Sequence, residues 1–182
     1  MQVRETGLAG LAVIEPTIHT DTRGFFLETW SADAYARAGI DAPFVQDNHS
    51  RSHKGVLRGL HYQLPGAQGK LVRVARGRIW DVAVDLRRES ATRGKWYGVE
   101  LDGESARQFW IPSGFAHGFL ALEDDTDVLY KCTAPYAPEH EHTLRWDDPA
   151  LDIAWPTGAV DAVSVSERDR AGLPFAEVPL FP

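Results

Sequence analysis

Hydrophobic and polar residues alternate over short runs along most of the chain, and glycine, proline or aspartate separates the runs. Such alternation is typical of β-strands, and its repetition at short spacing predicts a sandwich or barrel. We expect strands at residues 11–18, 25–30, 44–50, 56–63, 70–76, 79–86, 95–101, 107–111, 116–122, 126–133 and 142–146. The sequence therefore predicts one all-β domain over residues 1–182.

Helix signals are confined to two places. Residues 32–37 follow Ser31, which is expected to cap a helix, and precede Gly39, which is expected to end it. A second short helical turn is expected near Ser166. The fold is thus expected to carry one or two short helices beside its strands.

Turn and face signals add detail to the strands. Asp102-Gly103 is a strong hairpin signal for the strands on either side of it. In the run 126–133, Val128, Tyr130 and Cys132 share one face. The phenol of Tyr130 is therefore expected to be half-buried inside the protein.

Composition and charge narrow the possible functions. The 182 residues are 43% hydrophobic and 25% charged, which is ordinary for a globular domain and excludes a disordered chain. A net charge of −7 argues against a nucleic-acid or membrane partner, although it is compatible with a local basic pocket. Cys132 is the one cysteine, so an intramolecular disulfide is excluded. With no signal-peptide pattern and no run of ~20 apolar residues, we expect a cytoplasmic protein.

Residues 46–52 are unusually polar for a strand. Gln46, Asn48 and Ser50 have the same parity and line one face. An amide, a second amide and a hydroxyl in a row suit either a solvated outer face or the wall of a ligand cavity. This segment alone favours neither interpretation.

Arg58 and His61 lie in the next run and have opposite parity. Gly59 between them permits a bulge that turns both side chains inward. His61 is the best candidate base because histidine titrates near neutral pH, although a lone strand histidine is more often structural. Tyr130 is a candidate acid, with a core tyrosine as the alternative.

Residues 112–119 contain a Pro-x-Gly turn followed by His117 and resemble a segment of the cupin double-stranded β-helix, a jelly roll. Metal-binding cupins usually carry a His-x-His pair, whereas residues 61–63 are His-Tyr-Gln. Because zinc and iron sites need three or four ligands, the sequence favours a cavity with no metal. A metal held by two histidines with Glu28 or Glu141 is the weaker alternative.

Basic side chains near these segments suit an anionic ligand such as a diphosphate, with ordinary surface charge as the alternative. Phe26 is one of the aromatic residues that could stack on a base or a sugar. The basic residues are Arg23, Arg58, Lys70, Arg73 and Arg168, of which we interpret Arg73 as ordinary surface charge.

Six ordered segments together resemble the dTDP-4-dehydrorhamnose 3,5-epimerases, over nearly the whole chain. The segments are residues 21–28, 46–50, 55–63, 69–74, 81–87 and 112–119. The resemblance implies a cupin-type jelly roll that takes a dTDP-4-keto-6-deoxyhexose and uses no cofactor. It also implies epimerisation at carbons 3 and 5, which flank the keto group, to give dTDP-4-dehydro-β-L-rhamnose.

The resemblance implies a role for each matching residue. His61 matches the base, and Asp169 matches the carboxylate that orients it. Tyr130 matches the acid on the opposite face, and Lys70 matches a cation near the keto oxygen. The substrate-binding positions are Arg23, Phe26, Glu28, Gln46, Asp47, Asn48, Arg58, Lys70, His117, Glu141 and Arg168. Arg168 stands where the family often has Lys, a difference expected to alter affinity more than the reaction.

Several alternatives stay open at this point. The chain could be a monoepimerase acting at carbon 3 or carbon 5 alone; a ketoisomerase of the same barrel fits the motifs less well. A cupin that only binds a nucleotide sugar has no reason to keep His61, Asp169 and Tyr130 together. Because the family is dimeric, we expect a homodimer in which N-terminal segments complete a neighbour's site.

Overall fold

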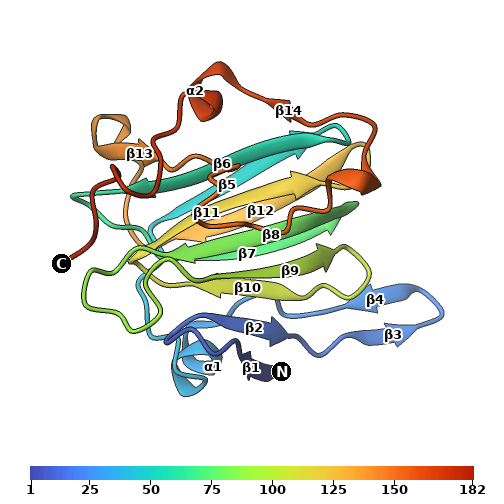
Figure 1. Ribbon diagram of the computed structural model, residues 1–182. Helices are drawn as coiled ribbons and strands as arrows, with labels where there is room; N and C mark the ends of the chain where they lie inside the picture. The colour runs from blue at the N-terminus through green and yellow to red at the C-terminus, as the bar shows by residue number, and fades with distance from the viewer.

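Two facing β-sheets form the body of the protein in the computed structural model, which describes residues 1–182 (Figure 1). The first sheet contains, in spatial order, β1 (Gln2–Glu5), β2 (Ala12–Glu15), β10 (Gln108–Ile111), β7 (Lys70–Arg76), β12 (Thr126–Cys132) and β5 (Gln46–Ser52). The second contains β13 (Glu141–Thr143), β6 (Val56–Gln63), β11 (Phe115–Ala121), β8 (Arg78–Asp85) and β9 (Trp96–Asp102), with β14 (Ser164–Val165) beside β6. The predicted all-β jelly roll is confirmed.

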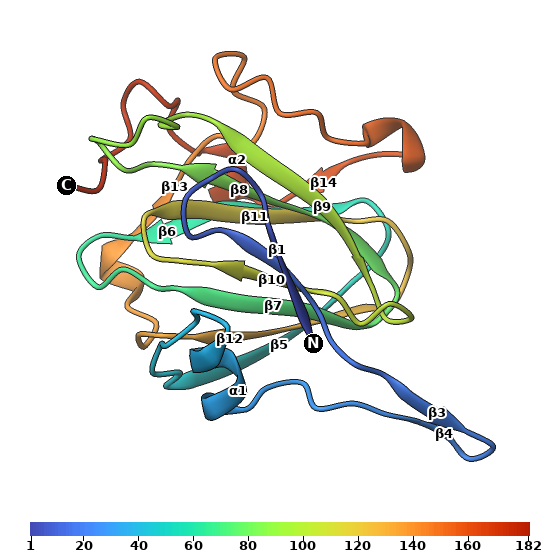
Figure 2. The same cartoon turned by 90° about the horizontal axis from the view of Figure 1, so that it is seen from below.

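The remaining elements are short. A hairpin of β3 (His19–Asp21) and β4 (Gly24–Phe26) belongs to neither sheet and projects from the body (Figure 2). The helices are α1 (Ala32–Arg37) and α2 (Glu167–Arg170), and two single 3₁₀ turns cover 138–140 and 157–159. No helix has the length and apolar character needed to span a membrane.

The main core fills the space between the two sheets. Alternation along β8 directs Ile79 and Ala83 into this core, where they join Phe109 from the first sheet. Val82 and Val84 lie on the opposite face of β8 and pack against residues of the C-terminal segment. Strand β8 is therefore buried on both faces, and its inward polar residues need partners inside the protein.

The predicted hairpin at Asp102-Gly103 is wrong. Strand β9 ends at Asp102 and pairs with β8, whereas β10 pairs with β2 and β7 in the first sheet. The Asp102 carboxylate accepts hydrogen bonds from the backbone N–H groups of Glu104 and Ser105 at 2.9 and 2.6 Å. The segment thus has the hydrogen bonds of a turn, but it connects strands of different sheets.

Helix α1 begins after Ser31, but the Ser31 side chain forms no capping hydrogen bond, contrary to expectation. The helix is held by Tyr35, which is 1% exposed and whose hydroxyl lies 2.9 Å from Gln108 Oε1. Gly39, with φ of 86°, follows the helix end as predicted. Helix α2 does have its cap, since Ser166 Oγ accepts from the Asp169 N–H at 3.0 Å.

Candidate active site

A break in the pairing of β6 with β11 shapes one wall of the site. His61 lies opposite His117 but Arg58 lies opposite Phe119, so β6 has one residue more than β11 between the two pairs. Gly59 accommodates the break with φ of 124°, and a Cβ at this position would lie 2.5 Å from the backbone of β11. The irregularity predicted at Gly59 is confirmed, and Arg58 and His61 line the same cavity.

This cavity has a volume of about 520 Å³ and lies between the two sheets, with helix α2 at its edge. Seven of the predicted site residues line it: Arg58, His61, Lys70, His117, Tyr130, Arg168 and Asp169. Three of these are cations and one is a carboxylate, so the cavity is locally positive within an acidic protein. An anionic ligand fits that charge.

His61 and Asp169 form the closest polar pair in the cavity. The Nε2 atom of His61 lies 2.5 Å from Asp169 Oδ1, across 108 residues of sequence. Burial raises the pKa of Asp169, but hydrogen bonds from His61, Gly59 and Ser166 outweigh burial and lower it. The ionised carboxylate accepts the Nε2 proton, which leaves Nδ1 as the basic nitrogen.

A second histidine–aspartate pair lines the same region, and its carboxylate was not among the predicted site residues. His117 Nε2 lies 2.6 Å from Oδ1 of Asp81, whose side chain is fully buried. Burial lowers the pKa of His117. The signal for Asp81 was available, because a carboxylate on the inward face of a strand buried on both sides needs a partner. No group of three or more His, Cys, Asp or Glu side chains is placed to hold a metal ion.

Lys70 and Tyr130 come from the first sheet and approach the cavity from the side opposite β6. Burial lowers the pKa of Lys70, and it raises the pKa of Tyr130, so the phenol keeps its proton at neutral pH. Tyr130 packs against the main core and lines the cavity, which confirms the predicted half-buried position. The cavity therefore places the His61 imidazole and the protonated Tyr130 phenol on opposite sheets.

The comparisons with known proteins agree with this geometry. Residues 5–177 match the model of the family described as dTDP-4-dehydrorhamnose 3,5-epimerase. The chain belongs to this family. The enzyme of that name from Methanothermobacter thermautotrophicus is 52% identical over 177 residues, which cover 97% of this chain and 96% of the relative.

Solved structures of epimerases share the fold closely. The dTDP-6-deoxy-D-glucose-3,5-epimerase of Legionella pneumophila Philadelphia 1, in complex with dTDP-4-keto-L-rhamnose, is 49% identical. The match has a TM-score of 0.94 and covers 98% of this chain and 94% of that one. A 3'-monoepimerase from Streptomyces bikiniensis, in complex with dTDP-quinovose, is 38% identical with a TM-score of 0.85, covering 94% and 86%.

Three further predicted site residues, Glu141, Gln46 and Asn48, lie next to the residues that line the cavity. The Arg168 guanidinium pairs with Glu141, which also accepts from the Tyr136 hydroxyl at 2.7 Å. Glu141 Oε1 is 3.9 Å from His61 Nδ1, so this cluster borders the His61 ring. On β5, Gln46 Nε2 donates to Asn48 Oδ1 at 3.0 Å. The face of β5 that carries these amides is the inner one, which settles the question left by its sequence.

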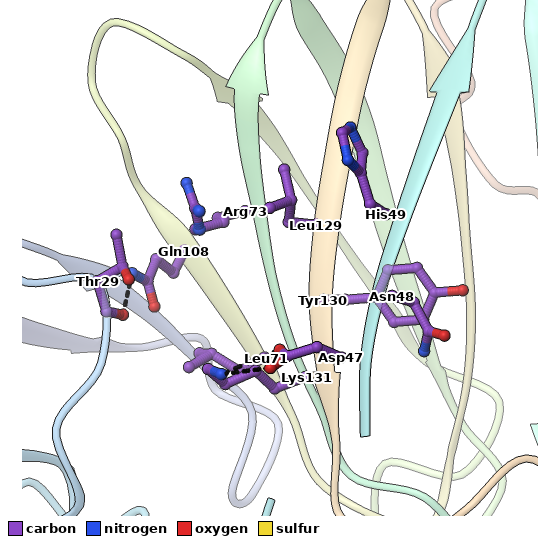
Figure 3. Close-up of a pocket in the computed structure, with 10 residues that line it drawn as sticks. All are labelled: Thr29, Asp47, Asn48, His49, Leu71, Arg73, Gln108, Leu129, Tyr130 and Lys131. Carbon is purple, nitrogen blue, oxygen red and sulfur yellow. Dashed lines mark hydrogen bonds and ion pairs between the residues drawn. The ribbon is translucent and has the colours of Figure 1, made fainter. Parts of the chain in front are cut away.

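Asp47 lies on the other face of β5. Its carboxylate accepts from Lys131 Nζ at 2.9 Å, beside a separate hollow of about 380 Å³ (Figure 3). Figure 3 shows Asn48 and Tyr130 directed away from Arg73, which borders the hollow. Arg73 is half-buried and burial lowers its pKa, so it is not the ordinary surface charge that we expected. The structure does not bring the Asp47 side chain to the cavity.

Three of the predicted binding residues lie in or next to the β3–β4 hairpin. Arg23 pairs with Asp21 at 2.5 Å, and the Phe26 side chain is 71% exposed. Glu28 is also exposed. None of the three lines the cavity of its own chain.

Proposed function

We propose that the protein epimerises dTDP-4-dehydro-6-deoxy-D-glucose at carbons 3 and 5 to dTDP-4-dehydro-β-L-rhamnose, as in dTDP-L-rhamnose biosynthesis. The observation that carries the proposal is the His61–Asp169 pair in one cavity with Tyr130, on strands of opposite sheets. Epimerisation needs this pairing, because a proton leaves one face of the carbon and another arrives at the opposite face.

The chemistry starts at a carbon beside the keto group. His61 Nδ1 takes the proton, and the electron pair moves onto the keto oxygen as an enolate. Tyr130 then gives its proton to the other face of the same carbon, which inverts the centre, and the carbonyl re-forms. Asp169 stabilises the imidazolium that forms on His61. His61 then releases its proton to solvent and Tyr130 takes one up, which restores both groups. A second round at the other carbon flanking the keto group completes the double epimerisation.

Cations in the cavity have two tasks under this proposal. Lys70 forms no ion pair with a carboxylate, so its ammonium is available to stabilise the enolate oxygen. Arg58 and Arg168 are exposed at the cavity and suit the diphosphate, since guanidinium groups bind phosphate oxygens in a fork. His117, held by Asp81, lines the same cavity as Lys70 and binds the sugar.

The protein acts as a homodimer in this proposal. Arg23, Phe26 and Glu28 match family positions that bind the nucleotide sugar, yet the hairpin carries them away from their own cavity. A protruding, exposed hairpin with two aromatic side chains fits insertion into a second subunit. Each site is then completed by its neighbour's hairpin.

The test is proton NMR of the protein with dTDP-4-keto-6-deoxyglucose in deuterated water. We expect deuterium at both carbon 3 and carbon 5, and dTDP-L-rhamnose once a reductase for the 4-keto group is added. Deuterium at one carbon alone would favour the monoepimerase, the alternative suggested by the solved 3'-monoepimerase. Deuterium at neither carbon would rule out proton abstraction beside the keto group.

A further inference from the structure

One polar atom in the wall of the cavity has no partner inside the protein. Ser50 lines the cavity, and its Oγ is buried without a hydrogen bond. Buried hydroxyl groups are nearly always hydrogen-bonded, because a hydroxyl that loses its hydrogen bonds to water on folding destabilises the protein unless a new partner replaces the water. An unpartnered hydroxyl in a binding cavity therefore indicates a partner that arrives with the ligand.

The other polar residues on the same face of β5 are already engaged. Gln46 donates to Asn48 at 3.0 Å, and Asn48 Nδ2 lies 3.5 Å from Cys132 Sγ. Ser52 Oγ accepts from Arg58 Nε at 3.1 Å. Ser50 is the exception in this row, so its free hydroxyl is not a general property of the strand.

The register of β5 and β12 shows where Ser50 sits. Asn48 lies opposite Tyr130 and Ser50 lies opposite Val128, which is fully buried and offers no hydrogen bond. Ser50 is thus the diagonal neighbour of Tyr130 on the same face. Diagonal neighbours are close enough for one small ligand group to contact both side chains. Figure 3 shows Asn48 and Tyr130 on this inner side of the two strands.

We propose that Ser50 Oγ hydrogen-bonds to a ring hydroxyl of the bound sugar and fixes the sugar's pose against Tyr130. This inference rests on the proposed function and names a contact that the family comparison did not supply. The buried Ser50 Oγ is better matched by a neutral sugar hydroxyl than by a charged phosphate. The exposed Arg58 and Arg168 suit the diphosphate. Ser50 is therefore a specificity-determining residue for the sugar.

The experiment compares Ser50→Ala with the wild type in turnover and in calorimetric binding. We expect kcat/KM to fall about tenfold, equivalent to about 1.4 kcal/mol. Binding of dTDP-glucose, a nucleotide sugar with no keto group to react, should weaken by a similar factor. Binding of dTDP should not change, because dTDP has the diphosphate and lacks the sugar.

Two further variants separate this contact from a structural effect. Ser50→Thr keeps the hydroxyl and should recover most of the lost affinity for dTDP-glucose. Ser113→Ala removes an exposed hydroxyl outside the cavity lining and should match the wild type in every assay. The Tm of Ser50→Ala should be no lower than that of the wild type, since the free protein loses only an unpaired group.

Unchanged turnover and unchanged dTDP-glucose binding in Ser50→Ala would overturn the proposal. Equal weakening of dTDP and dTDP-glucose would also overturn it, because the contact would then be to the diphosphate. A wild-type protein that binds dTDP-glucose but leaves dTDP-4-keto-6-deoxyglucose unchanged would refute the proposed function. In that case the binding comparison would still decide the role of Ser50.

Discussion

The ring of His61 is held by a carboxylate far away in the sequence. Asp169 is 4% exposed, yet its pKa is lowered because its carboxylate forms hydrogen bonds with the His61 ring, the Gly59 N–H and the Ser166 side chain. A carboxylate that stays ionised keeps the Nε2 proton in place and holds the ring in one orientation. Removing the imidazole should therefore affect chemistry far more than binding.

His61→Asn tests this expectation. Asparagine keeps a hydrogen-bonding group beside Asp169 but has no basic nitrogen, so turnover should fall at least about a hundredfold. The affinity for dTDP should stay within about threefold of the wild type, because Arg58 and Arg168 are intact. The matched control is His53→Asn, which changes a histidine that is 84% exposed and should leave both values unchanged. Substantial turnover in His61→Asn would show that another group is the base.

Tyr130→Phe should separate loss of a proton from its return. The substitution removes only the hydroxyl, so His61 can still take a proton and give back a deuteron to the same face. We expect NMR in deuterated water to show exchange without inversion, while product formation falls about a hundredfold. Tyr97→Phe, outside the cavity, is the control. Loss of exchange and of inversion to the same extent would contradict the assignment of Tyr130 as the acid.

Single residues also show what the sequence could and could not predict. The inward turn of both Arg58 and His61 followed from Gly59, because only a residue without Cβ fits so close to β11. The parity of β5 left its inner face open until pairing with β12 decided it. The Asp81–His117 pair was not predicted: burial of the strand indicates that Asp81 needs a partner, but no local pattern identifies a residue 36 positions away.

Strands were easier to predict than their connections. The bounds of β6 and β7 agree with the predicted runs 56–63 and 70–76, because alternation over seven or eight residues is a local property. The Asp102-Gly103 signal failed because pairing between sheets is not local. Strand β1 was missed because all four of its residues are exposed and none marks a buried face.

The loop between β8 and β9 depends on one carboxylate at the end of β8. Burial raises the pKa of Asp85, but hydrogen bonds from Arg87, Ser90 and Thr92 outweigh it and lower the pKa to about 2. These side chains donate at 2.6 to 2.9 Å to an Asp85 side chain that is fully buried. The carboxylate therefore ties residues 86–95 to the sheet.

Asp85→Asn should destabilise the protein in a pH-dependent way. A pKa of about 2 in the folded state, against ~3.9 unfolded, is worth about 3 kcal/mol of stability. This stability is present above pH 4 and is lost as the pH falls toward 2. The free energies of unfolding of the variant and the wild type should thus differ at pH 7 and converge near pH 2, as measured by urea titration.

Asp161→Asn is the control for this titration, because Asp161 is exposed and forms no side-chain hydrogen bond or ion pair. It should follow the wild type at every pH. A difference between Asp85→Asn and the wild type that stays constant from pH 7 to pH 2 would show that the charge of Asp85 is not what holds the loop.

The arrangement of the whole molecule separates the hairpin from the cavity. Hairpin β3–β4 projects from one side of the body, and helix α2, which borders the cavity, lies on the other (Figure 1). Phe25 and Phe26 are 68% and 71% exposed, which is costly for a hairpin that stays in solvent. A second subunit would cover these rings, and sedimentation should show a dimer.

Mixing two inactive variants tests whether the hairpin acts on a neighbour. One variant carries His61→Asn in the cavity, and the other carries Arg23→Ala with Phe26→Ala in the hairpin. If each cavity takes its partner's hairpin, a hybrid dimer has one site with an intact cavity and an intact hairpin. Random exchange makes half of the dimers hybrid, so co-refolded or co-expressed mixtures should regain about a quarter of wild-type activity.

The matched control mixes His61→Asn with Tyr130→Phe, both of which lie in the cavity of their own chain. Every cavity in that mixture carries one lesion, so no activity should return. No recovery in the first mixture, when sedimentation shows hybrids present, would mean that the hairpin serves its own chain or no site at all. Recovery confined to the first mixture would place the hairpin's residues in the neighbour's site, because no other arrangement brings two intact halves together.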